Sequence, residues 1–150
     1  MSGANDNTRR AIQQAEGFRR VRDAHQTEVA EDYVELIADL IEETGEARVV
    51  DLAHRLGVSN ATVNNTIQRL QRDGLVTSKP YRSIFLTVEG EVLASASRER
   101  HALVRDFLVA VGVAPEIAEA DTEGIEHHVS EATLEAFRKH LAKAGFRRKR

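Results

Sequence analysis

The chain of 150 residues contains no cysteine and no tryptophan, and only two prolines and one methionine. Without cysteine it has no disulfide bond, no zinc site built from thiolates and no cysteine nucleophile, which fits the reducing cytoplasm. Aromatic residues make up 5% of the chain, which argues against a surface of rings that stacks on bases or sugars. No stretch approaches the roughly 18 apolar residues of a membrane span, and the polar N-terminus does not resemble a secretory signal. These absences predict a cytoplasmic protein without membrane contact.

Charge is nearly balanced overall but segregated along the chain. Lys and Arg number 21 against 24 Asp and Glu, and the net charge of −3 excludes a simple polycation. Segments 27–44 and 91–137 each carry −7, whereas 45–90 carries +2 and 138–150 carries +7. Such blocks favour a protein that handles cations in one region and anions in another. Two solvated helix faces would give the same pattern, so charge alone leaves both interpretations open.

The spacing of apolar and capping residues predicts a mainly α-helical chain. Apolar residues recur at intervals of three and four from Val29 to Ile41, and Gly45 ends that pattern. Residues 1–27, rich in Asn, Gln and Arg, are predicted to form a flexible arm or a loosely docked helix. Helices are expected over residues 29–44, 49–56, 60–72, 88–111, 115–129 and 131–144, with a hairpin of strands 75–78 and 83–86 after the third.

Helix, glycine turn, helix and hairpin is the order of a winged helix-turn-helix, with Gly57 at the tight turn. The second helix carries short Asn and Thr side chains, which suit base edges in the major groove of DNA. Serine, tyrosine and basic side chains at the helix ends and the hairpin tip suit phosphates. The candidate DNA contacts are Ser59, Asn60, Thr62, Asn64, Asn65, Thr66, Arg69, Lys79, Tyr81 and Arg82. An ordinary helical hairpin with a polar face is the alternative interpretation.

Carboxylates and histidines with helical spacing form a second group. Glu123, Glu126 and His127 lie at positions i, i+3 and i+4, which places two carboxylates and one imidazole on one helix face. Asp32 and Glu35 form an i, i+3 pair at the edge of an apolar stripe. Carboxylates crowded at a packed edge repel one another unless a cation joins them. A divalent-metal site and a set of surface acids both remain open from spacing alone.

Taken together, these segments resemble the diphtheria toxin repressor family, in particular its manganese transport regulator (MntR) branch. The resemblance covers about residues 31–140 and is carried by DYVELI at 32–37, RERH at 98–101, EGIEHHVS at 123–130 and the helix-turn-helix with its hairpin. It implies a set of metal ligands at Asp32, Glu35, His101, Glu123, Glu126 and His127. Iron-sensing relatives carry Met and Cys where this chain has Asp32 and Glu123, and oxygen ligands suit Mn²⁺ better than softer ions.

The resemblance also implies a domain organisation and a function. The fold class is mainly α: a winged helix-turn-helix over 28–97, then an all-α metal-binding and dimerisation domain over 98–144, then a basic tail over 145–150. The implied protein is a Mn(II)-activated repressor of manganese uptake genes, in which the metal clamps a homodimer into the geometry that binds a palindromic operator on double-stranded DNA.

Three rival functions were weighed against this one. A winged-helix regulator that responds to Fe(II) uses the same oxygen and nitrogen ligands, and one that responds to an organic ligand needs an apolar cavity that a ring-poor chain does not suggest. A metal-dependent hydrolase needs an open coordination position and a general base. The chain has no HExxH motif, nucleophile constellation or phosphate-binding loop, so we expect neither an enzyme nor a small organic substrate.

Overall fold

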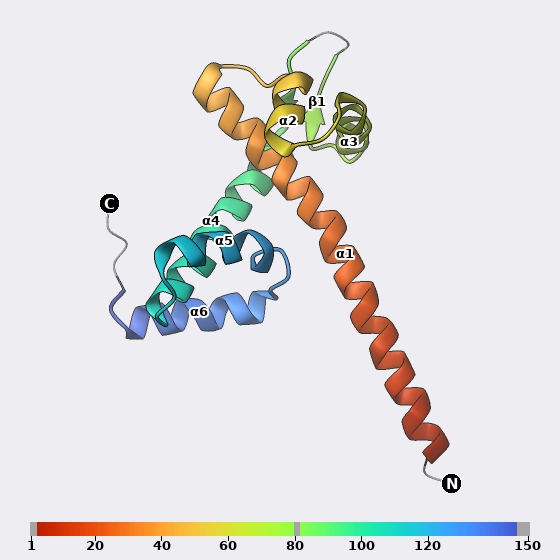
Figure 1. Cartoon of the computed structure of the whole chain (residues 1–150). Coiled ribbons are helices and arrows are strands. Elements are labelled where there is room, and N and C mark those ends of the chain that lie inside the picture. Colours follow the sequence, from red (N-terminus) through yellow and green to blue (C-terminus); the bar gives the residue numbers. More distant parts are fainter. Residues whose placement is uncertain (1–2, 80–81, 147–150) are drawn as a thin grey trace.

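The computed structural model describes residues 3–79 and 82–146. Over these residues the chain forms helices and one two-stranded antiparallel sheet, which confirms the mainly helical class (Figure 1). In chain order the elements are α1 (Gly3–Thr44), α2 (Val49–Leu56), α3 (Asn60–Arg72), β1 (Val76–Thr77), β2 (Phe85–Leu86), α4 (Val88–Ala110), α5 (Pro115–Ile125) and α6 (Glu131–Lys143).

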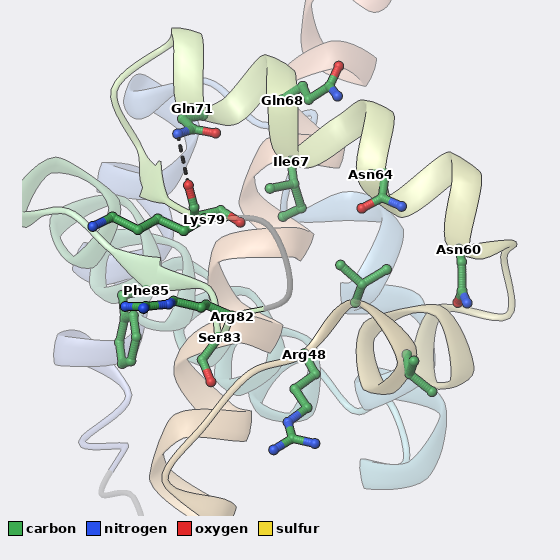
Figure 2. A pocket seen from close by; sticks show the side chains of 13 residues that line it. Arg48, Asn60, Asn64, Ile67, Gln68, Gln71, Lys79, Arg82, Ser83 and Phe85 are labelled. Atoms are coloured by element: carbon green, nitrogen blue, oxygen red, sulfur yellow. Dashed lines mark hydrogen bonds between the residues drawn. The ribbon is translucent and has the colours of Figure 1, made fainter.

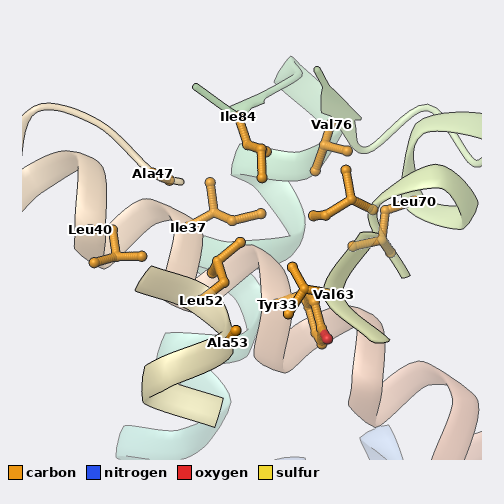
Figure 3. Packing of buried hydrophobic residues seen from close by; sticks show 11 residues of the cluster. Tyr33, Ile37, Leu40, Ala47, Leu52, Ala53, Val63, Leu70, Val76 and Ile84 are labelled. Atoms are coloured by element: carbon orange, nitrogen blue, oxygen red, sulfur yellow. The ribbon is translucent and has the colours of Figure 1, made fainter. Parts of the chain in front are cut away.

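One hydrophobic core joins the second half of α1 to α2, α3 and the hairpin (Figure 3). Ile37, Leu52, Val63 and Ile84 come from four different parts of the chain, and each is completely buried. Burying a side chain of this size stabilises the fold by about 1.5–3 kcal/mol. Because the core draws on all of these elements, it fixes α3 rigidly against α1.

The turn between α2 and α3 has the predicted chemistry. Gly57 ends α2 with a φ of 68°, in the left-handed region that glycine adopts without strain. The Ser59 hydroxyl then caps α3 by accepting a hydrogen bond of 3.1 Å from the backbone N–H of Thr62. The glycine turn and the cap together set the steep approach of the two helices.

The hairpin is present but its strands are shorter than expected. Val76 pairs with Leu86, and Thr77 pairs with Phe85. Leu75 donates instead to the carbonyl of Leu70 at the end of α3, and Ile84 pairs with the segment between α1 and α2. The flanking residues therefore have other backbone partners, which sequence alternation does not reveal.

The arm expected over residues 1–27 is helical in the part that the structure describes. Residues 3–27 continue into α1, which runs unbroken from Gly3 to Thr44. Ala, Arg, Gln and Glu favour helix and no proline interrupts them, so the backbone is helical although residues 4–23 bury no face. This half of α1 projects away from the rest of the chain (Figure 1), and hydrophobic periodicity could not detect it.

The long helix α4 connects the winged-helix part to α5 and α6. The expected domain boundary after residue 97 falls inside this helix, so both parts share it. Phe107 of α4 stacks on Phe137 of α6 with ring centroids 3.8 Å apart, which ties the C-terminal helices to α4. Helix α5 ends at Ile125, four residues before the expected end, and a turn carries Glu126 and His127. Among the described helices none is long and apolar enough to span a membrane.

Candidate metal centre and DNA-binding surface

Candidate metal ligands from α1, α4 and the end of α5 converge in space. The Nε2 atom of His127 lies 3.3 Å from Asp32 Oδ1 and 3.2 Å from Glu126 Oε1. On the other side, His101 Nδ1 lies 3.0 Å from Glu126 Oε2 and 3.8 Å from Glu123 Oε1. Glu126 therefore lies between the two imidazoles. The fold brings together residues that are up to 95 positions apart in the sequence, Asp32 and His127.

Glu35, the sixth candidate ligand, lies at the mouth of the same cluster. It accepts a hydrogen bond from Ser97 of α4. Together with Asp32 and Glu123 it lines a cleft of about 720 Å³ that also involves residues of α2. Burial raises the pKa of Glu35, and the neighbouring charges of Glu126 and Asp32 raise it further against the opposing hydrogen bond from Ser97. The cleft gives the cluster a solvent-facing opening lined by carboxylates.

Two buried atoms of the cluster are left without a hydrogen bond. Glu126 and His127 are 2% and 7% exposed. Glu126 Oε2 and His127 Nε2 have no hydrogen-bond partner among the described residues, although other candidate ligands lie within 3.3 Å of each. An unsatisfied buried polar atom costs about 1–3 kcal/mol, and more when it is charged. Donor atoms that face one another without bonding fit a site for a cation.

This crowding shifts the pKa values of side chains in the cluster. Burial lowers the pKa of His127, but the carboxylates of Asp32, Glu126 and Glu31 outweigh it and raise the pKa to about 12. Burial also raises the pKa of Glu123, and repulsion by Glu126 and Asp32 adds to the effect while His101 opposes it. The crowded carboxylates thus favour a positive charge among them, which the protonated ring of His127 supplies in the metal-free chain and which a bound cation would supply in its place.

Sequence spacing missed two carboxylates that contact the histidines. Glu31 Oε2 lies 2.7 Å from His127 Nδ1 and receives two hydrogen bonds from Arg100. Glu119 Oε1 lies 2.6 Å from His101 Nε2. Glu119 precedes Glu123 by one helical turn and was detectable from that spacing, whereas no periodicity links Glu31 to a histidine near the end of the chain.

Two residues border the cluster. Glu28 offers an oxygen within metal-ligand range of Asp32 and His127, and it also lies 3.4 Å from His128 Nε2. His128 is exposed and lies beside Glu28. Neither residue has its polar atoms enclosed as Glu126 and His127 do.

The second candidate surface is a groove between α3 and the hairpin (Figure 2). Its volume is about 1060 Å³, and Asn60 and Asn64 of α3 line it together with Lys79 and Arg82 of the hairpin. No acidic side chain is among the described residues that line it. Amides from α3 and cations from the hairpin match the mixture of base edges and phosphates in a DNA groove.

The remaining candidate DNA contacts are distributed around this groove. Thr62 and Asn65 are exposed on α3 outside it, whereas Thr66 and Arg69 are half-buried. Ser59 is the α3 cap, and Tyr81 lies outside the described residues. The groove also contains polar residues that sequence reasoning did not select, among them Arg48, Gln68 and Gln71. Gln68 and Gln71 continue the Asn60–Asn64 face by helical spacing, which was readable from the sequence.

A winged helix joined through a shared helix to a helical domain with a carboxylate–histidine cluster defines a metal-responsive DNA-binding regulator as the class of protein. The chain belongs to the iron-dependent repressor family. Residues 25–84 match its N-terminal DNA-binding domain, and residues 87–147 match its metal-binding and dimerisation domain.

Named relatives fall in the same class. The transcriptional regulator MntR of Escherichia coli O157:H7 is 59% identical over 130 residues, which cover 87% of this chain and 84% of that protein. The HTH-type transcriptional regulator MntR of Listeria monocytogenes (strain F2365) is 43% identical, over 67% of this chain and 70% of its own length.

Two solved structures are similar to this one. A manganese-dependent transcriptional repressor in complex with manganese is 31% identical with a TM-score of 0.67, and the match covers 80% of this chain and 54% of that one. The manganese regulator SloR is 27% identical with a TM-score of 0.65, over 75% of this chain and 53% of its own. The chain therefore spans about half the length of these two solved regulators.

Proposed function

We propose that the protein is a Mn(II)-activated DNA-binding transcriptional regulator that represses manganese uptake genes. The observation that carries the proposal is the pair of buried atoms, Glu126 Oε2 and His127 Nε2, that face other candidate ligands without a hydrogen bond. The regulators at 59% and 43% identity carry the name MntR, and the solved repressor at 31% identity is manganese-dependent and in complex with manganese.

The candidate ligands are hard donors suited to Mn²⁺. They comprise four carboxylates and two imidazoles without sulfur, from the residues Asp32, Glu35, His101, Glu123, Glu126 and His127. Oxygen and imidazole ligands suit Mn²⁺, which binds weakly in the usual affinity order and is selected by geometry. A bound divalent cation would neutralise the crowded carboxylates.

Metal binding then affects DNA through the shared helices. Asp32 and Glu35 lie on α1, which also packs against α3, whereas His101 lies on α4 and Glu126 follows α5. Holding these groups together fixes the winged-helix part, about residues 28–97, relative to the helical part, about residues 98–144. In a homodimer this fixes the distance between two recognition helices, which a palindromic operator requires. By linkage, operator DNA tightens metal binding in return.

Further parts of the proposal concern the setting. Transcriptional regulators of this kind act on double-stranded DNA in the cytoplasm, and we place the protein there. The DNA contacts would come from the α3 face and the hairpin, with Asn60 and Asn64 toward bases and Lys79 and Arg82 toward phosphates. Regulation of this kind requires binding alone, so the protein would not be an enzyme.

The test is a titration of metal-free protein with Mn²⁺, followed by electron paramagnetic resonance of the free ion and by operator gel shift. We expect saturable binding and metal-dependent operator binding in the wild type, and loss of both in Glu123→Ala. Asp121→Ala is the matched control, because it removes an exposed carboxylate from the same helix outside the cluster. Absence of Mn²⁺ binding in the wild type, or equal behaviour of the two variants, would overturn the proposal.

A further inference from the structure

The two candidate histidine ligands present opposite ring nitrogens to the cluster. His101 directs Nδ1 toward Glu126 and Glu123, at 3.0 and 3.8 Å. His127 directs Nε2 toward Asp32 and Glu126, at 3.3 and 3.2 Å. A neutral imidazole carries one N–H and one lone pair, so each ring can offer its lone pair to a metal only if the other nitrogen holds the proton.

A carboxylate lies at the outer nitrogen of each ring. Glu119 Oε1 is 2.6 Å from Nε2 of His101, and Glu31 Oε2 is 2.7 Å from Nδ1 of His127. Each carboxylate can therefore accept a hydrogen bond from an N–H on the outer nitrogen. A neutral ring with its proton on that nitrogen has its lone pair on the inner one. Acceptors at this position orient metal-bound histidines and fix their tautomers in many metalloproteins.

Each of these two carboxylates also contacts an arginine. Arg100 donates to both oxygens of Glu31, at 3.0 and 2.9 Å, and Arg105 lies 3.5 Å from Glu119 Oε2. Both arginines come from α4, on the two sides of His101. Glu31 therefore lies between the guanidinium of Arg100 and the Nδ1 atom of His127.

We propose that Glu119 and Glu31 are positioning residues that hold the proton on Nε2 of His101 and on Nδ1 of His127. When a metal binds, the proton that leaves the ring then comes from the inner nitrogen, which offers its lone pair to the metal. This inference rests on the proposed metal site and adds the residues that orient its two histidine ligands. It also separates the roles of two neighbours on α1: Asp32 faces the inner nitrogen of His127, whereas Glu31 faces the outer one.

Glu119 provides the cleaner variant, because its side chain is 50% exposed and its removal leaves no cavity in the core. Glu31 is 2% exposed, and its removal would take away the carboxylate to which Arg100 donates. In full-length metal-free protein, we expect Glu119→Ala to raise the Mn²⁺ dissociation constant about 10- to 100-fold with thermal unfolding unchanged. Glu119→Gln, which keeps an acceptor oxygen, should recover most of that loss, and Asp121→Ala should bind like the wild type.

The tautomers of both rings are read directly by NMR with isotope-labelled histidine and spin-active Cd²⁺ as a diamagnetic probe. We expect coupling to the metal at Nδ1 of His101 and Nε2 of His127, and a proton on the opposite nitrogen of each ring. Coupling at Nε2 of His101 would overturn the inference, because Glu119 would then lie on the metal side. Wild-type affinity in Glu119→Ala, or an equal loss in Asp121→Ala, would also overturn it. If the wild type binds neither ion, the proposed function itself fails.

Discussion

The metal-free protein should lose stability as the pH rises above neutrality. The cause is His127, whose pKa is about 12 in the folded chain and 6.5 in its ordinary state. Below about pH 6.5 the ring is protonated in the folded and the unfolded chain, and its stabilising contacts with Glu31, Asp32 and Glu126 are fully present. Between 6.5 and 12 the unfolded chain releases a proton that the folded chain keeps, so the stabilisation is lost as the pH rises.

The magnitude follows from the side chain of His127, which is fully buried. One proton held by the folded chain alone lowers the free energy of unfolding by about 1.4 kcal/mol per pH unit. Between about pH 6.5 and 8.5 the loss is therefore about 2–3 kcal/mol. The raised pKa values of Glu35 and Glu123 have the same sign at lower pH, because their stabilisation is lost as the pH rises above about 4.5.

Urea unfolding of metal-free protein at these two pH values, followed by far-ultraviolet circular dichroism, measures the effect. His128→Gln is the control, because it removes an exposed histidine next to His127 and should keep the wild-type pH dependence. With Mn²⁺ bound the dependence should reverse, since metal binding requires a deprotonated ring and is favoured by rising pH. A free energy of unfolding that stays constant or rises with pH in the metal-free protein would refute the reasoning.

Four further predictions concern packing and DNA binding. Gly90→Ala should lower the free energy of unfolding by about 1–3 kcal/mol, because the added Cβ would lie 2.1 Å from the backbone oxygen of Leu75. Gly17→Ala, with open space around it, should stabilise α1 by about 0.5–1 kcal/mol, and equal urea midpoints for the two variants would contradict this. Asn64→Ala should weaken operator binding by about 1–3 kcal/mol in fluorescence anisotropy and leave a scrambled duplex unaffected, whereas equal losses on both would exclude base reading. Lys79→Ala should reduce the slope of log affinity against log salt by about 1 on any duplex, and an unchanged slope would exclude a phosphate contact.

The winged-helix part was largely predictable because its signals are local. Gly57 and Ser59 mark the turn and the cap, and apolar spacing marks the buried face of each helix. The first half of α1 was not predictable in this way, since a helix that buries no face has no hydrophobic period. The ends of the strands could not be predicted from local sequence either, because Ile84 pairs with Ala47, which lies 37 positions earlier.

The candidate metal site was likewise predictable only where its signals are local in the sequence. The spacings within Glu123, Glu126 and His127 and within Asp32 and Glu35 are local. The resemblance over about residues 31–140 added His101 and joined the two groups into one site. The outer carboxylate Glu31 has no local signal, because its partner His127 is 96 residues away. Only the packing of the end of α5 against α1 places them in contact.

This contact bears on how a metal signal reaches DNA. Glu31 and Asp32 are consecutive residues of α1, and they face the two nitrogens of one buried ring, at 2.7 and 3.3 Å. A change at Nε2 of His127 therefore acts directly on Asp32. On the opposite side of the ring, Glu31 contacts Nδ1 and is itself bound by Arg100. The same helix supplies Ile37 to the core that supports α3. Because α1 is a continuous helix, a displacement at Asp32 cannot be absorbed by a loop before it reaches that core. A direct route from the metal cluster to the core that supports the DNA-reading helix thus runs along α1, over about one and a half turns from Asp32 to Ile37.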